Sequence, residues 1–397
     1  MIPHRRLMFV FGTRPEAIKM VPVIKEVRKY PDVFKSIVVV TGQHREMLDQ
    51  VLSIFNLRPD YDLSIMEADQ TLSSVTVKVL HGLEEIILRE RPDMVLVQGD
   101  TNTTFAAALS AYYQKVPVGH IEAGLRTGMK YSPFPEEINR RLTSVIADLH
   151  FAPTNRSVES LLREGIARNM IYLTGNTVID ALYEVAGRPY DLRRLNIDVD
   201  KKKKMILVTT HRRENFGTPL KNICEAVRQV AHKHAEITTV VLPVHKNPIV
   251  ASTVHEILGE LGNIQLIEPL DYEPFVHLMK EAYLVLTDSG GVQEEAPSLG
   301  KPVLVMREVT ERPEAVEAGT VRLVGTDINK IVKEAERLIT DEKEYKKMSQ
   351  AVNPYGDGKA SERIAGAILH FFGLIDRKPD DFVPRGLSPR DFVVKKA

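Results

Sequence analysis

Short runs of apolar residues alternate with longer amphipathic segments along almost the whole chain. The apolar runs are continuous, which is typical of strands that are buried on both faces of a parallel sheet. The repetition of strand, helix and strand predicts an α/β fold with helix-covered parallel sheets. In the first half, strands are predicted at Leu7–Phe11, Ile37–Val40, Met94–Gln98, Val116–Ile121 and His150–Ala152, and helices at Ala17–Lys29, Glu46–Phe55, Val75–Arg91, Thr104–Gln114 and Glu137–Ala147.

The alternation lapses at residues 187–204, a polar stretch that ends in four lysines. We interpret this stretch as a solvated junction rather than a nucleic-acid patch. Beyond it, strands are predicted at Met205–Thr209, Thr238–Leu242, Ile264–Ile267, Leu284–Thr287 and Val303–Met306, and helices at Leu220–Lys233, Pro248–Leu261, Pro274–Glu281, Val292–Leu299, Ile328–Leu338 and Lys359–Phe371. We therefore expect an N-terminal domain at 1–186, a second domain at 205–373 whose terminal helix can pack back on the first, and a charged surface segment or mobile tail at 374–397.

Composition narrows the class of protein. The 397 residues allow two or three domains of about 150 residues each. The 53 basic and 53 acidic side chains cancel, which argues against a nucleic-acid partner. Cys224 is the single cysteine, so an internal disulfide and a multi-cysteine zinc site are excluded, and we expect it to serve packing. No apolar run approaches the roughly 20 residues of a membrane helix, and the first one is too short for a signal peptide. We expect a cytoplasmic protein without membrane insertion.

The first strand ends in a turn that could bind an anion. Its sequence is Gly12-Thr-Arg-Pro-Glu16, in which glycine permits the turn and Pro15 suits the first helical position. Arg14 and Lys19 bring positive charge to the helix N-terminus, where phosphate groups bind in many α/β proteins. An ordinary strand-helix turn with an exposed arginine explains the pattern equally well. Because the turn is not Gly-x-Gly-x-x-Gly, a dinucleotide cofactor is unsupported.

Three carboxylates are predicted to lie at one edge of the sheet. This edge is formed by the carboxyl ends of the strands, where ligands of open parallel sheets bind. Asp100 follows the strand that ends at Gln98, Glu122 follows the next strand, and Glu136 begins a helix. Each has a structural explanation, and for Asp100 the motif alone favours a helix N-cap. Taken together they suggest more, because crowded carboxylates raise one another's pKa and can hold protons for general acid/base catalysis.

Two strand ends of the second domain carry histidines. His211 follows a strand directly and is flanked by Arg212 and Arg213, which favours anion recognition. His245 follows the next strand, where a structural role and a binding role both remain open.

The strongest local signal is Thr287-Asp-Ser-Gly-Gly-Val-Gln-Glu-Glu-Ala296, which follows an apolar strand and opens a helix. Ser289, Gly290 and Gly291 would present backbone N–H groups that suit a diphosphate. Glu295 lies within the first turns of that helix, where its carboxylate could reach ribose hydroxyls. We favour the ligand site over a plain glycine-rich turn.

Five motifs in this order resemble the non-hydrolysing UDP-N-acetylglucosamine 2-epimerases over roughly Leu7–Gly373. They are Gly12-Thr-Arg-Pro-Glu16, Gln98-Gly-Asp100, His120-Ile-Glu-Ala-Gly-Leu-Arg126, Thr210-His-Arg-Arg-Glu-Asn215 and Asp288-Ser-Gly-Gly-Val-Gln-Glu-Glu295. The resemblance implies a glycosyltransferase-B-like fold of two Rossmann-like domains, with the active site in the cleft between them, and a homodimer. It implies an isomerase that needs neither metal nor cofactor.

The resemblance also implies residue roles. Catalytic roles fall on Asp100, Glu122, Glu136 and His211. UDP contacts fall on Arg14, Lys19, Phe275, Ser289, Gly290, Gly291, Glu295 and Arg312. The implied reaction converts UDP-N-acetylglucosamine (UDP-GlcNAc) to UDP-N-acetylmannosamine (UDP-ManNAc) by eliminating UDP to 2-acetamidoglucal and adding it back, which supplies ManNAc-type sugars for cell-surface polysaccharide.

One region departs from the family pattern. Many bacterial members bind a second UDP-GlcNAc as an activator through a Gln-His-x-Gln-Met segment and a downstream arginine. Here Gln43, Arg212 and His245 match, but Glu46 and Asp69 stand at the other two positions. Carboxylates disfavour a diphosphate ligand, so we expect activator binding to be weakened. The changes keep open a related UDP-diacetamido sugar as substrate, and a glycosyltransferase or a non-catalytic nucleotide-sugar sensor remain alternatives.

Overall fold

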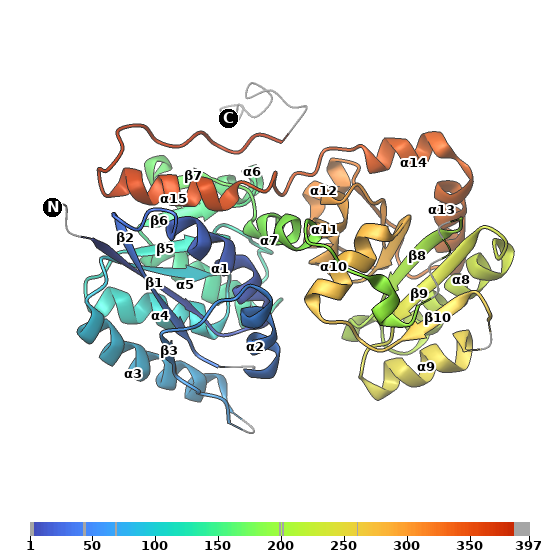
Figure 1. The fold of residues 1–397 in the computed structure, drawn as a ribbon, viewed down its shortest axis with the longest axis horizontal. Coiled ribbons are helices and arrows are strands. Elements are labelled where there is room, and N and C mark those ends of the chain that lie inside the picture. Colours follow the sequence, from blue (N-terminus) through green and yellow to red (C-terminus); the bar gives the residue numbers. More distant parts are fainter. Residues whose placement is uncertain are drawn as a thin grey trace. The chain divides into compact units, whose positions relative to one another are not determined.

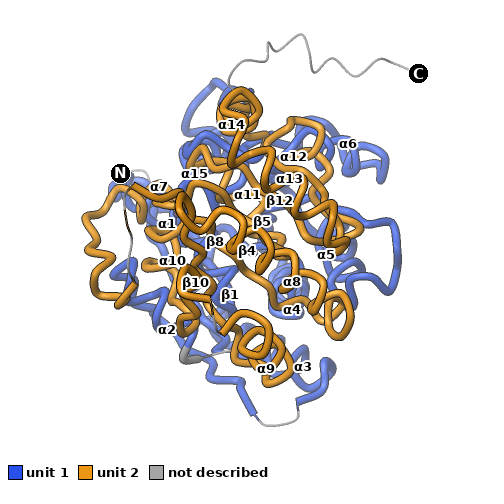
Figure 2. The backbone as a smooth tube through the Cα atoms, turned by 90° about the vertical axis from the view of Figure 1, so that its right-hand side faces the viewer, with its two compact units in different colours: residues 1–181, 355–383, 387–397 blue, residues 182–354, 384–386 orange. Residues whose placement is uncertain are grey.

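The computed structural model describes residues 4–42, 45–67, 70–197, 200, 202–259 and 261–384. They form two compact units, one of residues 1–181, 355–383 and 387–397 and one of residues 182–354 and 384–386 (Figure 2). The strands are β1 (Arg5–Phe11), β2 (Phe34–Val40), β3 (Tyr61–Asp62), β4 (Met94–Gln98), β5 (Val118–Ile121), β6 (Leu149–Ala152), β7 (Ile171–Leu173), β8 (Lys204–Thr209), β9 (Thr238–Pro243), β10 (Ile264–Ile267), β11 (Leu284–Thr287), β12 (Val303–Val305) and β13 (Val321–Leu323). The α-helices are α1 (Arg14–Val27), α2 (Arg45–Ile54), α3 (Leu72–Glu90), α4 (Asn102–Tyr113), α5 (Glu136–Ile146), α6 (Asn155–Arg163), α7 (Thr177–Ala186), α8 (Thr218–Lys233), α9 (Pro248–Leu258), α10 (Tyr272–Glu281), α11 (Val292–Ser298), α12 (Pro313–Glu317), α13 (Ile328–Thr340), α14 (Glu342–Ser349) and α15 (Ala360–Phe371).

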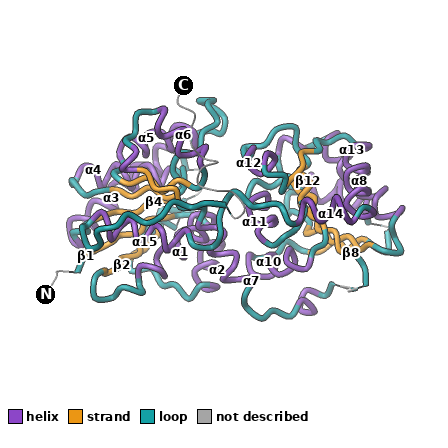
Figure 3. Tube along the Cα trace, turned by 90° about the horizontal axis from the view of Figure 1, so that it is seen from above, coloured by secondary structure: helices purple, strands orange, loops and turns teal. Residues whose placement is uncertain are grey.

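Unit 1 is built on a seven-stranded sheet in the order β3-β2-β1-β4-β5-β6-β7, with parallel neighbours throughout. Alternate residues of each strand face opposite sides, and helices cover both (Figure 3). Met8 and Val10 pack with apolar residues of α3 and α4 in one buried cluster. The sequence switches direction across the sheet between β1 and β4, so the carboxyl ends of these strands are the expected ligand position.

Unit 2 repeats this plan with a six-stranded parallel sheet in the order β10-β9-β8-β11-β12-β13. Its core joins these strands to α8, α9 and α13. Here the direction switches between β8 and β11, which are the strands that precede His211 and Ser289. The predicted α/β class with two Rossmann-like domains is confirmed.

The predicted strands of both halves are present within a few residues of their predicted ends. The pattern did not predict β3, β7 and β13, because runs of two or three residues carry too little periodicity. It also missed α6, α7, α12 and α14.

The division into units differs from the predicted boundaries. It falls between Ala181 and Leu182, inside α7, and the chain returns to unit 1 at Tyr355. Helix α15 packs against α1 (Figure 1). Part of the predicted tail is also packed, since Phe382 is buried and its N–H donates to Leu173 O at 2.7 Å along the edge strand β7.

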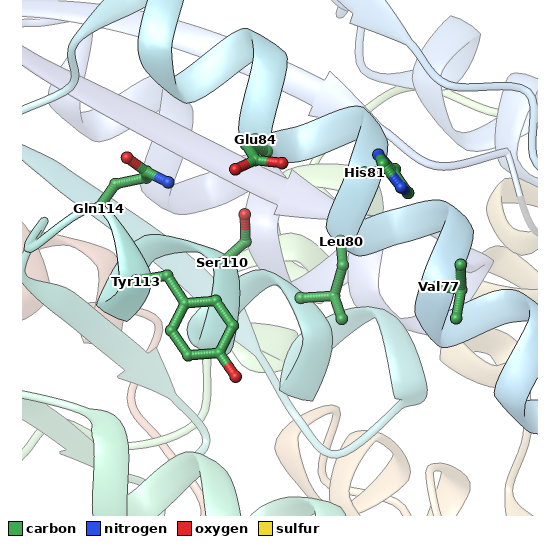
Figure 4. Close-up of a pocket in the computed structure, with 7 residues that line it drawn as sticks. All are labelled: Val77, Leu80, His81, Glu84, Ser110, Tyr113 and Gln114. Atoms are coloured by element: carbon green, nitrogen blue, oxygen red, sulfur yellow. The ribbon is translucent and has the colours of Figure 1, made fainter.

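A cavity of about 340 Å³ lies on α3 and α4, lined by Val77, Leu80, His81, Glu84, Ser110, Tyr113 and Gln114 (Figure 4). None of the predicted site residues lines it. No helix in the described ranges is long and apolar enough to cross a membrane.

Candidate functional site

Asp100 lies in the turn between β4 and α4, with its side chain 27% exposed. Arg140 Nη2 from α5 donates to its Oδ2 at 2.5 Å. Burial raises the pKa of Asp100 to about 6, an effect that Arg140 opposes and the charges of Glu122 and Glu136 reinforce. The N-cap interpretation of Asp100 is wrong, because Thr101 occupies that position and accepts from the N–H of Thr104. The side chain of Asp100 therefore does not cap α4, and its partner is Arg140.

Glu122 follows β5 and is held by donors from three elements. Lys19 Nζ donates to both of its oxygens at 2.6 Å, Gln98 Nε2 donates at 2.5 Å and Asn176 Nδ2 at 3.0 Å. Its backbone φ is +65°, a left-handed conformation that costs free energy for a residue with a Cβ and tends to persist at functional sites. The contacts favour the charged carboxylate. Lys19, predicted to contact UDP, thus lies on a predicted catalytic residue.

Glu136 begins α5 as predicted and is half-buried. Its Oε2 is buried and has no hydrogen-bond partner within the described residues. Unit 1 brings Glu122 and Glu136 close enough to Asp100 for their charges to raise its pKa. The three carboxylates differ in surroundings: Asp100 has a raised pKa, Glu122 is held by four hydrogen bonds, and Glu136 has an oxygen without a partner.

In the turn after β1, the backbone N–H groups of Gly12 and Thr13 are already bound and are not available to an anion. Glu16 Oε2 accepts from the N–H groups of Gly12 and Thr13, and Pro15 has no N–H to offer. The carboxylate of Glu16 thus fills the position that a phosphate would take. What the turn still offers to an anion is the half-buried side chain of Arg14.

In unit 2, Asp288 plays a comparable role beneath the turn after β8. It is fully buried and accepts from the N–H groups of His211 and Arg212, from Thr210 Oγ1 and from Asn215 Nδ2, at 3.0–3.2 Å. Its Oδ1 also lies 3.3 Å from Nδ1 of His211. Burial lowers the pKa of His211, with Asp288 opposing. The imidazole is therefore oriented by a carboxylate, and burial disfavours its protonated form.

The turn after β11 keeps free backbone donors. Ser289 N–H donates to Thr287 Oγ1 at 2.9 Å, whereas the N–H groups of Gly290 and Gly291 donate to no acceptor in the described part of the chain. A Cβ added at Gly290 would lie 3.4 Å from Nη2 of Arg212. The buried Nε of Arg212 has no partner among the described residues. This guanidinium and the two glycine N–H groups form an anion-binding arrangement.

The other predicted UDP contacts of unit 2 are Glu295, Phe275 and Arg312. Glu295 is buried in α11 and accepts from the hydroxyl of Tyr272 at 3.2 Å. Phe275, half-buried, lies in the first turns of the same helix as Tyr272. Arg312 donates through Nε to Glu294, so it is anchored to α11 by an ion pair.

The predicted activator residues are only partly described. Gln43 and Asp69 lie outside the described residues, as does the side chain of Glu46. His245 is exposed and stacks on His211, with ring centroids 5.9 Å apart. Arg212 lies beside Gly290, within the predicted UDP turn.

No group of three or more metal-ligating side chains is placed to hold an ion within the described ranges.

A family model described as UDP-N-acetylglucosamine 2-epimerase matches residues 25–369. The chain belongs to the UDP-N-acetylglucosamine 2-epimerase family. The resemblance carried by the five motifs is thereby confirmed.

Relatives of this family member cover nearly its whole length. The UDP-N-acetylglucosamine 2-epimerase of Escherichia coli K12 is 55% identical over 91% of this chain and 98% of its own. A structure of an S. aureus protein with UDP is 51% identical, covers 96% of this chain and 100% of that one, and has a TM-score of 0.84. The Neisseria meningitidis UDP-GlcNAc 2-epimerase bound to UDP-GlcNAc is 49% identical over 92% and 100%, with a TM-score of 0.82.

Sequence reasoning missed the side chains that support the site in this family member. Arg140 lies four residues after Glu136, so helical spacing could have placed it on the same face of α5. Asp288 belongs to the motif Thr287–Ala296, but only the other residues of that motif were considered as site residues. Gln98 and Asn176 carry no local signal, because their contact with Glu122 depends on the pairing order of the strands.

Proposed function

We propose that the chain catalyses the reversible epimerisation of UDP-GlcNAc at C-2 of the sugar, which gives UDP-ManNAc. The observation that carries the proposal is the group of three carboxylates of unit 1, whose surroundings differ in the way that acid/base chemistry requires. Membership of the family and the UDP and UDP-GlcNAc named in two related structures support the same substrate.

The C-2 proton is not adjacent to a carbonyl, so its direct removal is difficult. We infer an elimination: a base removes the C-2 proton, the C-1 oxygen bond to UDP breaks, and 2-acetamidoglucal forms. A proton then adds to C-2 from the opposite face while UDP adds back to C-1. The two faces of C-2 require more than one proton-transfer group.

The environments of the carboxylates support a division of roles. Asp100, with a pKa of about 6, suits proton transfer near neutral pH. Glu136 has a buried oxygen that no described residue contacts by a hydrogen bond, and we assign it to the opposite face. Glu122, saturated by Lys19 and two amides, is better suited to hold charge than to exchange a proton.

The leaving UDP would be stabilised by positively charged side chains and backbone N–H groups. Arg212 with Gly290 and Gly291 suits the developing negative charge on the diphosphate. Arg14 and His211 would add to it. Ser289, Phe275, Glu295 and Arg312 remain proposed contacts of the nucleotide. We further infer a homodimer whose product enters the synthesis of ManNAc-containing surface polysaccharide.

The decisive experiment is proton NMR of the purified protein with UDP-GlcNAc alone in heavy water. UDP-ManNAc that carries deuterium at C-2 is the expected product, because the second proton comes from solvent-exchanged side chains. Free ManNAc and UDP would identify a hydrolysing enzyme. An unchanged spectrum despite measured binding would contradict the proposal and favour a diacetamido sugar, an acceptor-dependent glycosyltransferase or a sensor.

A further inference from the structure

Glu16 is a buried carboxylate that the proposed reaction does not use directly. Only 2% of the residue is exposed, and its two oxygens bind two different turns. Oε2 accepts from the N–H of Gly12 at 3.0 Å and of Thr13 at 2.7 Å. Oε1 accepts from the hydroxyls of Thr101 at 2.6 Å and Thr104 at 3.1 Å.

These contacts exceed what a helix cap requires. A capping box needs only the bond from the N-cap N–H, here that of Thr13, to the carboxylate three residues later. The bonds to Oε1 come instead from Thr101, which directly follows Asp100 in the turn between β4 and α4, and from Thr104 in the first turn of α4. One carboxylate thus joins the turn that carries Arg14 to the turn that carries Asp100.

The turn that Glu16 holds is closely packed at Gly12. A Cβ at Gly12 would lie 2.1 Å from Thr41 Oγ1 and 2.9 Å from Thr103 Oγ1, so the first turn is packed closely against β2 and α4. In such a dry contact the charge-assisted bonds of Glu16 are strong, and losing an acceptor leaves buried donors unsatisfied.

We propose that Glu16 is a positioning residue, which fixes the proton-transferring Asp100 relative to the diphosphate-contacting Arg14. This inference rests on the proposed function, because it assumes that both residues act on one substrate. A displacement of about 1 Å between reacting groups can lower a rate about 100-fold. Loosening the bridge should therefore affect turnover far more than folding.

The test is Glu16→Gln, which keeps the size of the side chain but replaces one acceptor oxygen by a donor NH₂. The matched control is Asp180→Asn. Asp180 also accepts from two backbone N–H groups and one hydroxyl, those of Ala360 and Ser361, within unit 1, and it joins α7 to α15 rather than the two turns. Both proteins are assayed for kcat and KM with UDP-GlcNAc and for amide hydrogen exchange by mass spectrometry.

For Glu16→Gln we expect kcat to fall about 10- to 100-fold and exchange to accelerate in both turns, residues 12–13 and 101–104. For Asp180→Asn we expect lower thermal stability with kcat within about twofold of the unmodified protein. A kcat of Glu16→Gln within about twofold, or faster exchange in the first turn alone, overturns the proposal. If the unmodified protein does not turn over UDP-GlcNAc, the proposed function fails, and unchanged exchange at 101–104 still overturns the bridge.

A second variant covers the case in which Glu16→Gln does not fold. Thr101→Val removes the shorter bond to Oε1 and leaves Glu16 on the first turn. Since Thr101 also caps α4, the control is Thr71→Val, which removes the equivalent N-cap of α3. We expect kcat to fall at least about 10-fold for Thr101→Val and to change less than about twofold for Thr71→Val. Equal kcat values for the two variants overturn the proposal.

Discussion

Asp288→Asn tests whether a buried carboxylate holds the turn that carries His211 and Arg212. The fully buried Asp288 accepts hydrogen bonds from four groups, two of them backbone N–H groups of that turn. Asparagine keeps one acceptor oxygen, but its NH₂ would face donors instead of accepting from them. Hydrogen bonds to a charged group contribute about 1.5–3 kcal/mol each, so the loss of two should lower the free energy of unfolding by roughly 3–6 kcal/mol.

The assay is urea unfolding followed by circular dichroism, in which the midpoint should fall by about 1 M or more. The matched control is Asp327→Asn in the same unit. Asp327 is an exposed N-cap that accepts from the N–H of Lys330 at 2.8 Å, and asparagine caps helices equally well, so its midpoint should scarcely change. If both variants unfold at the same urea concentration, the carboxylate of Asp288 does not hold the turn.

Two further predictions concern unit 1. The pKa of Asp100 is raised to about 6. If its ionised form acts as the proposed base, kcat/KM should fall as the pH drops through about 6, and Asp100→Asn should abolish turnover at every pH. A pH-rate profile with circular dichroism at each pH checks this, and a profile that stays flat down to pH 4.5 contradicts it. Phe382→Ala should lower the free energy of unfolding by roughly 3–5 kcal/mol, because the Phe382 side chain is buried in a cluster with apolar residues of β6, α6 and β7. The exposed Phe371→Ala is the control, and equal urea midpoints would show that the segment contributes nothing to stability.

Much of the fold could be predicted from local pattern. Central strands that are buried on both faces are apolar along most of their length, so β4 and β11 match the predicted ranges residue for residue. The motifs at strand ends located the chemistry for the same reason, because parallel strands deliver their carboxyl ends to one edge of a sheet. Residue order along the chain was enough for these conclusions.

Contacts between distant segments followed from tertiary structure alone. No local pattern predicts that Lys19 contacts Glu122, 103 residues away, or that Glu16 contacts Thr101. Both contacts arise because β4 lies beside β1 and β5 beside β4, and strand order is not encoded in local periodicity. The sequence analysis did allow for the return of α15 to unit 1, where this helix packs against α1.

The sequence by itself determined which side chains reach the ligand edge of each sheet. Only the tertiary structure decided their chemical state, because burial and neighbouring charges set a pKa and the neighbours come from other strands. Asp100 shows the difference: the sequence favours a helix cap, whereas burial and the charges of Arg140, Glu122 and Glu136 make it a carboxylate that titrates near pH 6.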